Sequence, residues 1–557
     1  MNLLNNIEFS NQLINTVLTS LTDKKIERIK KAIQGCITFN NYPDFECDLR
    51  EFDWQSGHEQ RNWWFQLQQL PTLAWATGVW PDNMEELKKN AIQYNFDVIH
   101  NWQDKHNNAG KYKKTLAWHD HASALRVLNL FNWAVFCKED NVESKLITNI
   151  FDLIQTHIEW LLDDKNYSRH TNHGYDQAWI IIFIASYCPQ ATWAKSALDI
   201  AQKRLKSEVD FAFTEQGVHK ENSPGYHWSM LKRLRELQSF TQDHENSSSK
   251  GFSLNQLIEK AEMFLDAIAL DSCKLPLIGD TQEKEKHIKD ISKLRSKLHE
   301  LHHDDEEFYD YTDSGYLIWR RSSNVGQIPY HFVMKCAHLA NYHRHDDDLA
   351  IHFEYDGEII LGDSGGYSHN KADLLRQYAR SPYAHTTVFP DGTNTGIRKK
   401  SKLKNEPVIK WNRENQEVEG HTYQYLPLKL QRTVKFINKQ GRMFEVIDHA
   451  TNLSEDPLKV VTNFVIPYYD AKITNQIDLG VIGFSSNSHS FRLELEREKI
   501  IGINTIYGLG DTINQTAVIS KNICAYEPIT RLEIYWLATP NCENTFKWTL
   551  ACKTNTH

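Results

Sequence analysis

The distribution of apolar residues changes once along the chain. Up to about residue 300, apolar residues recur at three- and four-residue steps, as at 141–162 and 192–213, which predicts amphipathic helices. Clusters of Asn, Gly, Pro and Asp at 105–114, 163–174 and 221–227 separate the helical segments. Many helices of medium length in succession indicate a layer of antiparallel helix pairs.

The helical pattern ends with a charged segment at 283–301 and an acidic stretch at 303–310. Beyond them the apolar runs are short, β-branched or aromatic, and bounded by Gly, Asn and Asp, which is typical of antiparallel strands. Such runs lie at 315–321, 330–337, 349–363, 442–450 and 531–539. We therefore expect a two-domain α+β chain, helical at 1–305 and antiparallel β at 306–557, with a ligand cleft between the domains.

Length and composition agree with a large two-domain protein of 557 residues. The net charge of −9 argues against a general nucleic-acid binder, because such a protein needs a broad basic field. A few local Lys and Arg residues can still hold an acidic sugar polymer. The 16 Trp, 23 Tyr and 25 Phe favour a carbohydrate ligand weakly, since exposed rings stack on sugar faces.

The cellular compartment is predicted from the cysteines and the N-terminal segment. The nine cysteines are widely spaced and form no Cys-x-x-Cys pair, so we expect buried thiols in a reducing compartment. The N-terminal segment lacks a basic region followed by an apolar run, and no run of about 18 apolar residues occurs. The expected location is the cytoplasm, or the periplasm if a leader was removed, without a membrane segment.

Two polar clusters in the helical part carry candidate chemistry. Asn172 and His173 lie in TNHGYDQAW at 171–179, in a loop that leads into a helix. Tyr226 lies in GVHKENSPGYHW at 217–228, after a Ser-Pro-Gly turn and before a helix. Taken alone, the first cluster also fits a helix capped by Asn beside a surface His, and the second fits an ordinary helix start with a core Tyr.

A third cluster precedes a strand of the β domain. His343 and His345 stand in NYHRHDDDLAIHF, and their spacing allows either one shared metal or two separate roles. Asp363 ends the next strand and His385 follows a further loop, so His345, Asp363 and His385 could converge from adjacent strands. Two His and one carboxylate suit zinc, with another group completing a tetrahedron, unless the three are unrelated surface groups.

Taken together and in this order, the clusters resemble the heparinase II/III-like superfamily, which includes heparin and heparan sulfate lyases, several alginate lyases and the lyase-like domain of dermatan sulfate epimerase. The resemblance rests on Asn-His-Gly at 172–174, Ser-Pro-Gly-Tyr-His at 223–227, His-x-His-x-Asp at 343–347, Asp-x-Gly at 363–365 and Ala-His-Thr-Thr-Val at 384–388. It implies an incomplete (α/α) toroid packed on an antiparallel β-sandwich, with the substrate between them.

The resemblance also implies a zinc site at the positions that match His345, Asp363 and His385. The zinc is expected to be structural, holding the loop that carries His343, rather than a catalytic Lewis acid. Two departures leave the substrate class open. Thr386 stands where the family usually has Asn, and the acidic run at 346–348 is denser than expected.

The reaction that the resemblance implies is β-elimination across a uronate. Asn172 and His173 would neutralise the C5 carboxylate by hydrogen bonding, because enolate-like charge develops on it. Tyr226 would act as acid or base, alone or with His343 or His173. This role requires cationic neighbours that bring the Tyr226 pKa down from about 10, and His343 and Arg126 are candidates.

Three further residues are predicted to bind substrate: His121 and Arg126 in WHDHASALR, and Glu221 before the Tyr226 turn. His121 also fits simple packing, and Glu221 also fits a carboxylate placed near a helix start. The predicted partner is an acidic polysaccharide or oligosaccharide, without nucleic acid or membrane, and the oligomeric state cannot be read from the sequence.

Two other functions agree with the same sequence. A uronate C5-epimerase would abstract the same proton and return it from the other face without breaking a glycosidic bond. A non-catalytic protein that binds acidic polysaccharide, or assists its biosynthesis, would retain the fold but would not need Asn172, Tyr226 and His343 together.

Overall fold

The computed structural model describes residues 9–40, 42–55, 60–106, 116–243, 254–298, 306–322, 328–337, 339–340, 343–368, 370, 372–394, 408–439 and 441–552. Contacts between residues divide the chain into two compact units. Unit 1 comprises Met1–Ala212 with Thr241–Phe252, and unit 2 comprises Phe213–Phe240 with Ser253–His557.

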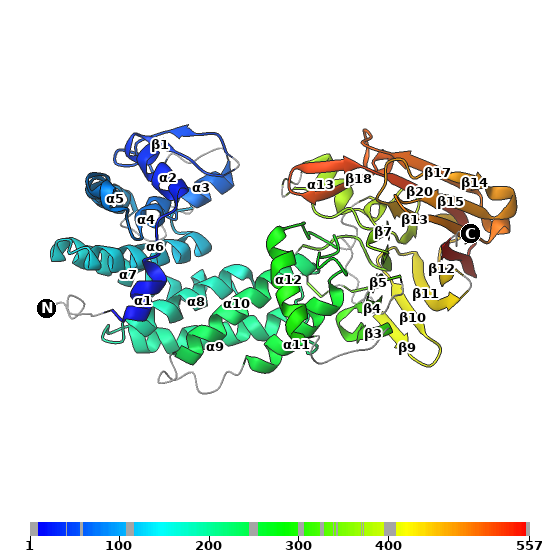
Figure 1. Cartoon of the computed structure of the whole chain (residues 1–557), viewed down its shortest axis with the longest axis horizontal. Coiled ribbons are helices and arrows are strands. Elements are labelled where there is room, and N and C mark those ends of the chain that lie inside the picture. Colours follow the sequence, from blue (N-terminus) through cyan, green and yellow to red (C-terminus); the bar gives the residue numbers. More distant parts are fainter. Residues whose placement is uncertain are drawn as a thin grey trace. The chain divides into compact units, whose positions relative to one another are not determined.

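Helices make up most of the described chain before residue 299 (Figure 1). They are α1 (Asn11–Val17), α2 (Asp23–Ile33), α3 (Arg61–Leu67), α4 (Pro71–Ala76), α5 (Glu85–His106), α6 (Asp120–Glu139), α7 (Ser144–Leu162), α8 (Asn172–Tyr187), α9 (Ala194–Ala212), α10 (Pro224–Asp243), α11 (Asn255–Ile268) and α12 (Glu285–Leu298). The helices predicted at 141–162 and 192–213 are confirmed as α7 and α9. Most of the turn predicted at 105–114 lies outside the described residues.

In unit 1, α6 is apolar on most sides because it packs against α4, α7 and α8. The sequence did not predict the two-residue strands β1 (Cys36–Ile37) and β2 (Phe45–Glu46), which pair antiparallel.

Among the described residues, no helix is both long and apolar enough to cross a membrane. All nine cysteines are free, but Cys524 and Cys542 are exposed, so the expectation of buried thiols is wrong for these two.

Strands dominate the described chain from residue 306 onward, as predicted. They are β3 (Glu306–Tyr311), β4 (Tyr316–Arg321), β5 (Tyr330–Lys335), β6 (Ala350–Tyr355), β7 (Glu358–Leu361), β8 (Val388–Pro390), β9 (Val408–Asn412), β10 (Glu417–Thr422), β11 (Leu428–Lys439), β12 (Arg442–Asn452), β13 (Leu458–Ile466), β14 (Thr474–Gln476), β15 (Val481–Ser485), β16 (Ser490–Leu495), β17 (Gly502–Tyr507), β18 (Val518–Asn522), β19 (Ala525–Pro528), β20 (Thr530–Ala538) and β21 (Glu543–Cys552). A short helix, α13 (Leu374–Ala379), lies among them.

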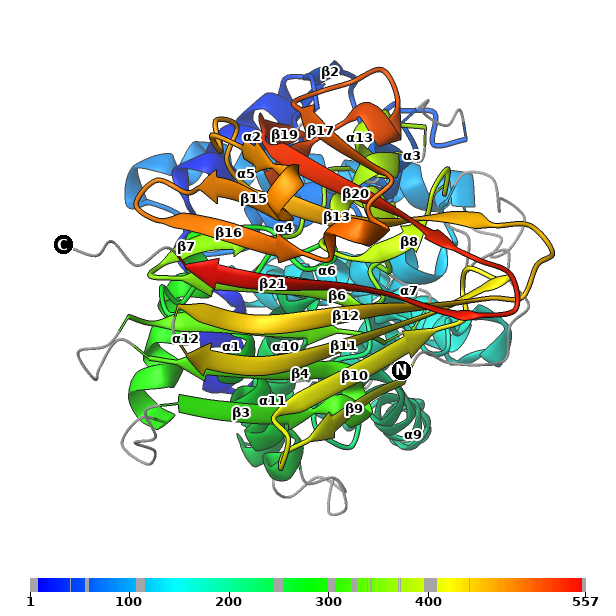
Figure 2. The ribbon, with the colours of Figure 1, turned by 90° about the vertical axis from the view of Figure 1, so that its right-hand side faces the viewer.

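The strands form antiparallel sheets whose inner faces share one apolar core. The sheet orders are β3-β4-β5-β6-β7, β14-β15-β16-β21-β12-β11-β10-β9, β17-β20-β13-β8 and β18-β19, and Figure 2 shows the long strands β11, β12 and β21 side by side. Phe444 of β12 contacts Phe332 of β5 and Phe353 of β6, with ring centroids 5.0 and 5.2 Å apart. The predicted antiparallel β-sandwich is therefore confirmed.

Helices α10, α11 and α12 group with the sheets in unit 2, although the secondary structure changes later, between α12 and β3. Polar contacts join α11 to the five-stranded sheet. His331 Nε2 lies 2.9 Å from the Ala267 carbonyl oxygen, and Arg320 Nη1 donates to the Asp266 carbonyl oxygen at 2.9 Å. The five-stranded sheet thus has helices packed on one side and the β core on the other.

One buried arginine joins the sandwich to the loops that precede β6 and β8. The Arg432 guanidinium is fully buried and pairs with Asp448 through Nε at 2.6 Å and Nη2 at 3.0 Å. Its Nη1 also donates to the carbonyl oxygens of Leu349 at 2.9 Å and Thr386 at 3.1 Å. Because every donor group of a buried charge needs a partner, this arginine fixes the segment that carries His385 against the core.

Candidate functional site

The predicted catalytic residues fall in different units: Asn172 and His173 belong to unit 1, and Tyr226 and His343 to unit 2. In unit 1, helix α8 begins at Asn172, and the capping residue is Thr171, whose Oγ1 accepts from the Gly174 N–H at 3.1 Å. The alternative interpretation, in which Asn172 caps this helix, is therefore wrong. The Asn172 side chain is exposed and has no hydrogen-bond partner among the described residues.

A close approach of the backbone positions this helix start. A Cβ at Gly174 would lie 2.4 Å from the Ser168 carbonyl oxygen, so only glycine fits there. The segment before α8 can consequently fold back over the first turn of the helix. His173, in that first turn, is brought beside α6 by the packing of α6 on α8.

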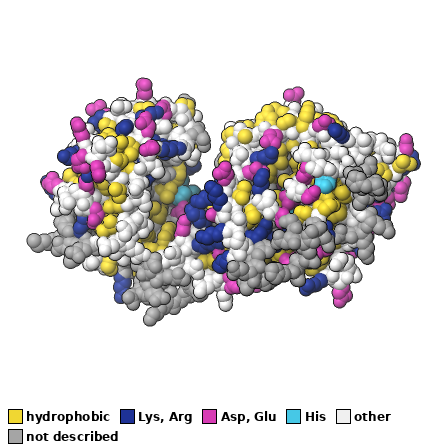
Figure 3. All heavy atoms as spheres, viewed as in Figure 1, with side chains coloured by type: hydrophobic (Ala, Val, Ile, Leu, Met, Phe, Trp, Pro, Cys, Tyr) yellow, Lys and Arg dark blue, Asp and Glu magenta, His cyan; other side chains and the backbone are white. Residues whose placement is uncertain are grey.

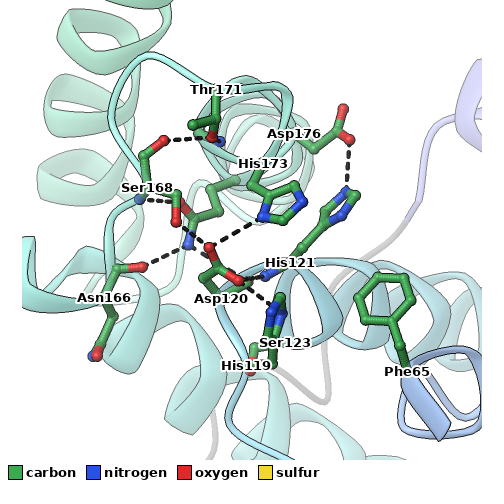
Figure 4. A network of polar contacts seen from close by, with 12 residues as sticks. Phe65, His119, Asp120, His121, Ser123, Asn166, Ser168, Thr171, His173 and Asp176 are labelled. Atoms are coloured by element: carbon green, nitrogen blue, oxygen red, sulfur yellow. Dashed lines mark hydrogen bonds and ion pairs between the residues drawn. The ribbon is translucent and has the colours of Figure 1, made fainter. Parts of the chain in front are cut away.

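Asp120, at the start of α6, holds His173. Its Oδ2 lies 3.1 Å from His173 Nδ1 and accepts a hydrogen bond from the Ser168 hydroxyl (Figure 4). Its Oδ1 lies 2.7 Å from His119 Nδ1 and accepts a hydrogen bond from the His121 backbone N–H at 2.8 Å. Burial raises the Asp120 pKa, but hydrogen bonds from His119, His173 and Ser168 outweigh it, so the pKa lies well below the usual value. Asp120 is therefore an anion that directs Nδ1 of His173 inward and leaves Nε2 for another partner.

A second imidazole and carboxylate pair lies against the first. The rings of His121 and His173 stack with centroids 4.2 Å apart, and His121 Nε2 lies 2.8 Å from Asp176 Oδ2 (Figure 4). The Phe65 ring packs near the His121 ring, with the two ring centroids 5.6 Å apart. The predicted substrate-binding residue His121 thus lies directly beside His173, and both side chains are partly exposed.

The structure contradicts the substrate-binding role predicted for Arg126. Its side chain is fully buried, with the guanidinium 4.2 Å from the Trp102 ring centroid. It donates to His157 Nε2 at 2.8 Å and to the carbonyl oxygens of Gln68 and Ala117, each at 2.6 Å. Arg126 therefore stabilises the interior of unit 1 and presents no charge to a ligand.

In unit 2, the Tyr226 ring stacks on the His343 imidazole with centroids 3.7 Å apart. Helix α10 begins at Pro224, which places Tyr226 in its first turn. His343 Nδ1 lies 2.9 Å from Asp280 Oδ2, and its Nε2 lies 3.6 Å from Glu221 Oε2. The predicted neighbours Tyr226 and His343 are thus in contact, and Glu221 lies beside the imidazole.

The surroundings of Tyr226 differ from those that the sequence suggested. Burial raises the Tyr226 pKa, and the negative charges of Asp280 and Glu221 raise it further. The expected lowering of this pKa by cations is therefore wrong. The neutral phenol, which can donate a proton, is the favoured form.

The predicted zinc ligands His345, Asp363 and His385 come together. All three are buried, and one potential ligand atom from each lies within 4.8 Å of the other two. An antiparallel bridge pairs Asp363 with His385, and Asp363 Oδ2 lies 2.7 Å from His385 Nδ1. His345 Nδ1 and His385 Nε2 are buried without a hydrogen-bond partner among the described residues. Buried imidazole nitrogens of this kind beside a carboxylate fit a zinc ion.

Asp280 is a residue of this cluster that the sequence reasoning missed. Its Oδ1 lies 2.9 Å from His345 Nε2, and its Oδ2 holds His343. A carboxylate that orients a ligating imidazole is the usual outer partner of a metal site. A signal existed: Gly279-Asp280 follows a short apolar run, just as Gly362-Asp363 does.

The dense acidic run contributes to the interior of unit 2. Asp346, Asp347 and Asp348 are all buried. Asp347 forms an ion pair with the buried Lys335, and Asp348 Oδ2 accepts from the Thr422 hydroxyl at 2.8 Å. This departure from the family pattern therefore has a structural explanation, and none of the three aspartates belongs to the group of His345, Asp363 and His385.

Three solved structures are similar to this chain. Heparinase III is 14% identical with a TM-score of 0.77, covering 99% of this chain and 88% of that chain. The heparinase III BT4657 gene product is 16% identical with a TM-score of 0.73, covering 98% and 87%. Heparan sulfate lyase HepC from Pedobacter heparinus is 15% identical with a TM-score of 0.69, covering 97% and 84%. At these identities the similarity shows the fold, a helical toroid followed by an antiparallel β domain, as predicted.

Curated proteins give no match to the sequence. Two family models do match it: Heparinase II/III N-terminus over residues 4–309, and Heparinase II/III-like, C-terminal over residues 304–519. Together they span nearly the whole chain in the order expected from its helical and β parts. The chain belongs to the heparinase II/III-like family.

Proposed function

We propose that the protein is a polysaccharide lyase that cleaves a uronate-containing acidic polysaccharide or oligosaccharide by β-elimination. The family membership supports the general class. The observation that carries the finer proposal is the Tyr226 ring stacked on His343, which Asp280 holds through Nδ1. This arrangement supplies a proton donor and an oriented imidazole at one place.

The first task in the reaction is to neutralise the uronate carboxylate, because the C5 proton is otherwise only weakly acidic. Asn172 has a free amide for this purpose, and His173, held through Nδ1 by Asp120, would donate through Nε2 when protonated. His121 lies close enough to assist. Such hydrogen bonds strengthen as negative charge develops on the carboxylate.

The second task is to move two protons. In our proposal Tyr226 is the acid that protonates the departing glycosidic oxygen, since burial and two carboxylates favour its neutral form. His343 is the candidate base for the C5 proton, with Glu221 3.6 Å from its Nε2. Of the geometries that the sequence allowed, this one places acid and base on different residues.

We also propose that zinc binds His345, Asp363 and His385, with Asp280 orienting His345. When bound, the ion would supply a fixed positive charge and hold together the segments that carry these ligands. The role is structural. His343 would then keep its place two residues from a ligand, with Asp280 fixing its ring.

A row of lysines in unit 2 supports an acidic partner. Lys and Arg side chains gather over α12 in Figure 3, and the exposed lysines Lys286, Lys289, Lys293 and Lys297 recur at three- and four-residue steps along this helix. Lys286 lies 5.9 Å from the ring of Trp228, which is two residues after Tyr226 on α10. A positive helix face near Tyr226 would attract a polyanion.

The test is ultraviolet absorbance during incubation with alginate, heparan sulfate, hyaluronate, chondroitin and bacterial capsular polysaccharides. Elimination creates a double bond conjugated to the carboxylate, so the absorbance of the correct polymer rises. Tyr226→Phe should abolish the rise, whereas Tyr526→Phe, at an exposed position of β19, should keep it. A rise that persists in Tyr226→Phe would refute the assigned acid. If the absorbance rises on none of the polymers but solvent deuterium is incorporated at C5 of the uronate, the protein is instead an epimerase.

A further inference from the structure

A cavity lies in unit 2 on the sheet of β8, β13, β20 and β17. Its volume is about 490 Å³, within the range of small-molecule sites. It is lined by residues of β17, of β20 and of the short 3₁₀ helix Ile513–Gln515, together with Tyr383 and Asp391. None of the candidate catalytic or zinc residues contributes to it.

The floor of this cavity carries polar side chains of two neighbouring strands, among them the exposed Asn504 and the buried Glu533. Asn504 of β17 lies in register with Glu533 of β20, and paired residues of neighbouring strands share one face of a sheet. Glu533 is 2% exposed and accepts from the Tyr535 hydroxyl at 2.5 Å and from Asn504 Nδ2 at 3.3 Å. A polar floor of this kind does not suit an apolar ligand.

The charges around the cavity are already paired. Arg531 is fully buried, forms an ion pair with Glu533 and donates through Nε to the Thr516 carbonyl oxygen at 3.1 Å. Asp391 lies 3.3 Å from Lys459 Nζ. Among the described residues that line it, the cavity therefore offers no unpaired cation to a uronate carboxylate or a sulfate.

The rim supplies an aromatic face and free amide groups. Tyr507 is 48% exposed, with the Tyr469 ring 6.3 Å away in a T-shaped contact. The amide oxygens of Asn514 and Gln515 accept from the Thr512 hydroxyl, while their amide nitrogens have no partner among the described residues. Amides and carboxylates match the donating and accepting hydroxyls of a sugar, and its C–H face packs on an aromatic ring.

We propose that this cavity is a binding site for an uncharged sugar residue, separate from the residues proposed for elimination. The polar floor would hold the hydroxyl groups, and Tyr507 would cover one face of the sugar ring. A polymer that carries neutral sugars between its uronates, or a neutral glycan, contains suitable ligands. The site does not depend on the lyase proposal, because none of its residues takes part in that chemistry.

Ligand-observed saturation-transfer NMR on the full chain tests this proposal with cellotetraose, maltotetraose and diacetylchitobiose, each at millimolar concentration. We expect at least one of these neutral sugars to bind. Tyr507→Ala and Asn504→Ala should each weaken binding by about tenfold or more, because each removes a direct contact. Both positions are exposed, so the variants should keep the thermal unfolding temperature of the wild type.

Tyr526→Ala is the matched control. Tyr526 is 43% exposed and has the Tyr367 ring 6.3 Å away in a T-shaped contact, as Tyr507 has with Tyr469. It should bind the sugar as the wild type does. The proposal fails if no neutral sugar binds, if Tyr507→Ala and Asn504→Ala bind normally, or if a uronate oligosaccharide competes equally for the site. These outcomes leave the absorbance test of elimination unaffected.

Discussion

At the scale of single residues, Asp120 holds several groups of unit 1 at once. It accepts from Ser168 and the His121 backbone and lies against His119 and His173. An anion in this position fixes which nitrogen of His173 can reach a substrate. We therefore regard Asp120 as a positioning residue that acts through His173.

Asp120→Asn should lower kcat by about tenfold to a hundredfold, the equivalent of about 1.5–3 kcal/mol for a hydrogen bond to a charged group. KM should change little, because the carboxylate of the substrate is neutralised mainly as charge develops in the transition state. Steady-state kinetics and thermal unfolding measure both effects. Asp199→Asn, at an exposed position of α9 in unit 1, is the control. If kcat falls only in proportion to the fraction of folded protein, Asp120 has a structural role and does not act through His173.

Glu354 of β6 predicts a pH dependence of stability. Its pKa is raised from 4.5 to about 7, chiefly by burial, and the negative charge of Asp271 adds to this, although a hydrogen bond from the Asp271 backbone opposes it. Between these two values the unfolded chain ionises while the folded chain stays protonated, so stability is lost as pH rises from 4.5 to about 7. The loss is at most about 3 kcal/mol.

Glu354→Gln should remove this loss. Urea unfolding at several pH values should show the variant gaining stability relative to the wild type as pH rises from 4.5 to about 7. Glu498→Gln, at an exposed position, should show no such trend. A constant difference between Glu354→Gln and the wild type at all pH values would contradict the assignment.

At the scale of elements, α12 predicts an electrostatic contribution to substrate binding. The double change Lys289→Glu and Lys293→Glu should raise KM for an acidic polymer by roughly threefold to tenfold at low salt. The effect should shrink as salt is added, because both side chains are exposed to solvent. Lys410→Glu with Lys435→Glu, on β9 and β11, reverses the same number of exposed charges and serves as the control. Identical effects of the two pairs would show only a response to net charge.

Local periodicity made the helices and strands predictable from the sequence, whereas contacts between distant segments were not predictable. The helices α7 and α9 agree with the patterns that predicted them, because one buried face leaves a regular trace in the sequence. Strand β6 is buried on both faces, and it was predicted together with β7 from short β-branched and aromatic runs bounded by turn residues. The two-residue strands β1 and β2 are too short to leave such a trace.

Within the candidate site, the grouping of His345, Asp363 and His385 could be predicted from motifs that resemble those of the family, but their neighbours could not. Asp280 meets His343 and His345 across 63 and 65 residues of chain, and although its Gly-Asp motif marks a candidate position, that motif does not indicate these contacts. The sequence around Arg126 is that of an ordinary charged residue on a helix. Only the structure shows that its side chain is fully buried. The raised pKa of Tyr226 likewise depends on carboxylates brought in from other segments.

At the scale of the whole molecule, zinc should contribute to stability. Metal analysis of the purified protein should find about one zinc ion per chain, and a chelator should lower the unfolding temperature by roughly 5 °C. His385→Gln should lose both the metal and the response to the chelator, whereas His421→Gln, on β10, should keep them. Zinc-free wild-type protein that gains no stability on addition of zinc would refute the metal site.

Asp280 offers one carboxylate oxygen to His343 and the other to His345. The same side chain therefore belongs to the proposed proton-transfer pair and to the proposed zinc site. Changes at Asp280 and at either histidine should not add, because they share one partner. In evolution or in protein engineering, a substitution of Asp280 that alters the proposed proton-transfer pair alters the proposed zinc site as well, so the two sites cannot change independently through this residue.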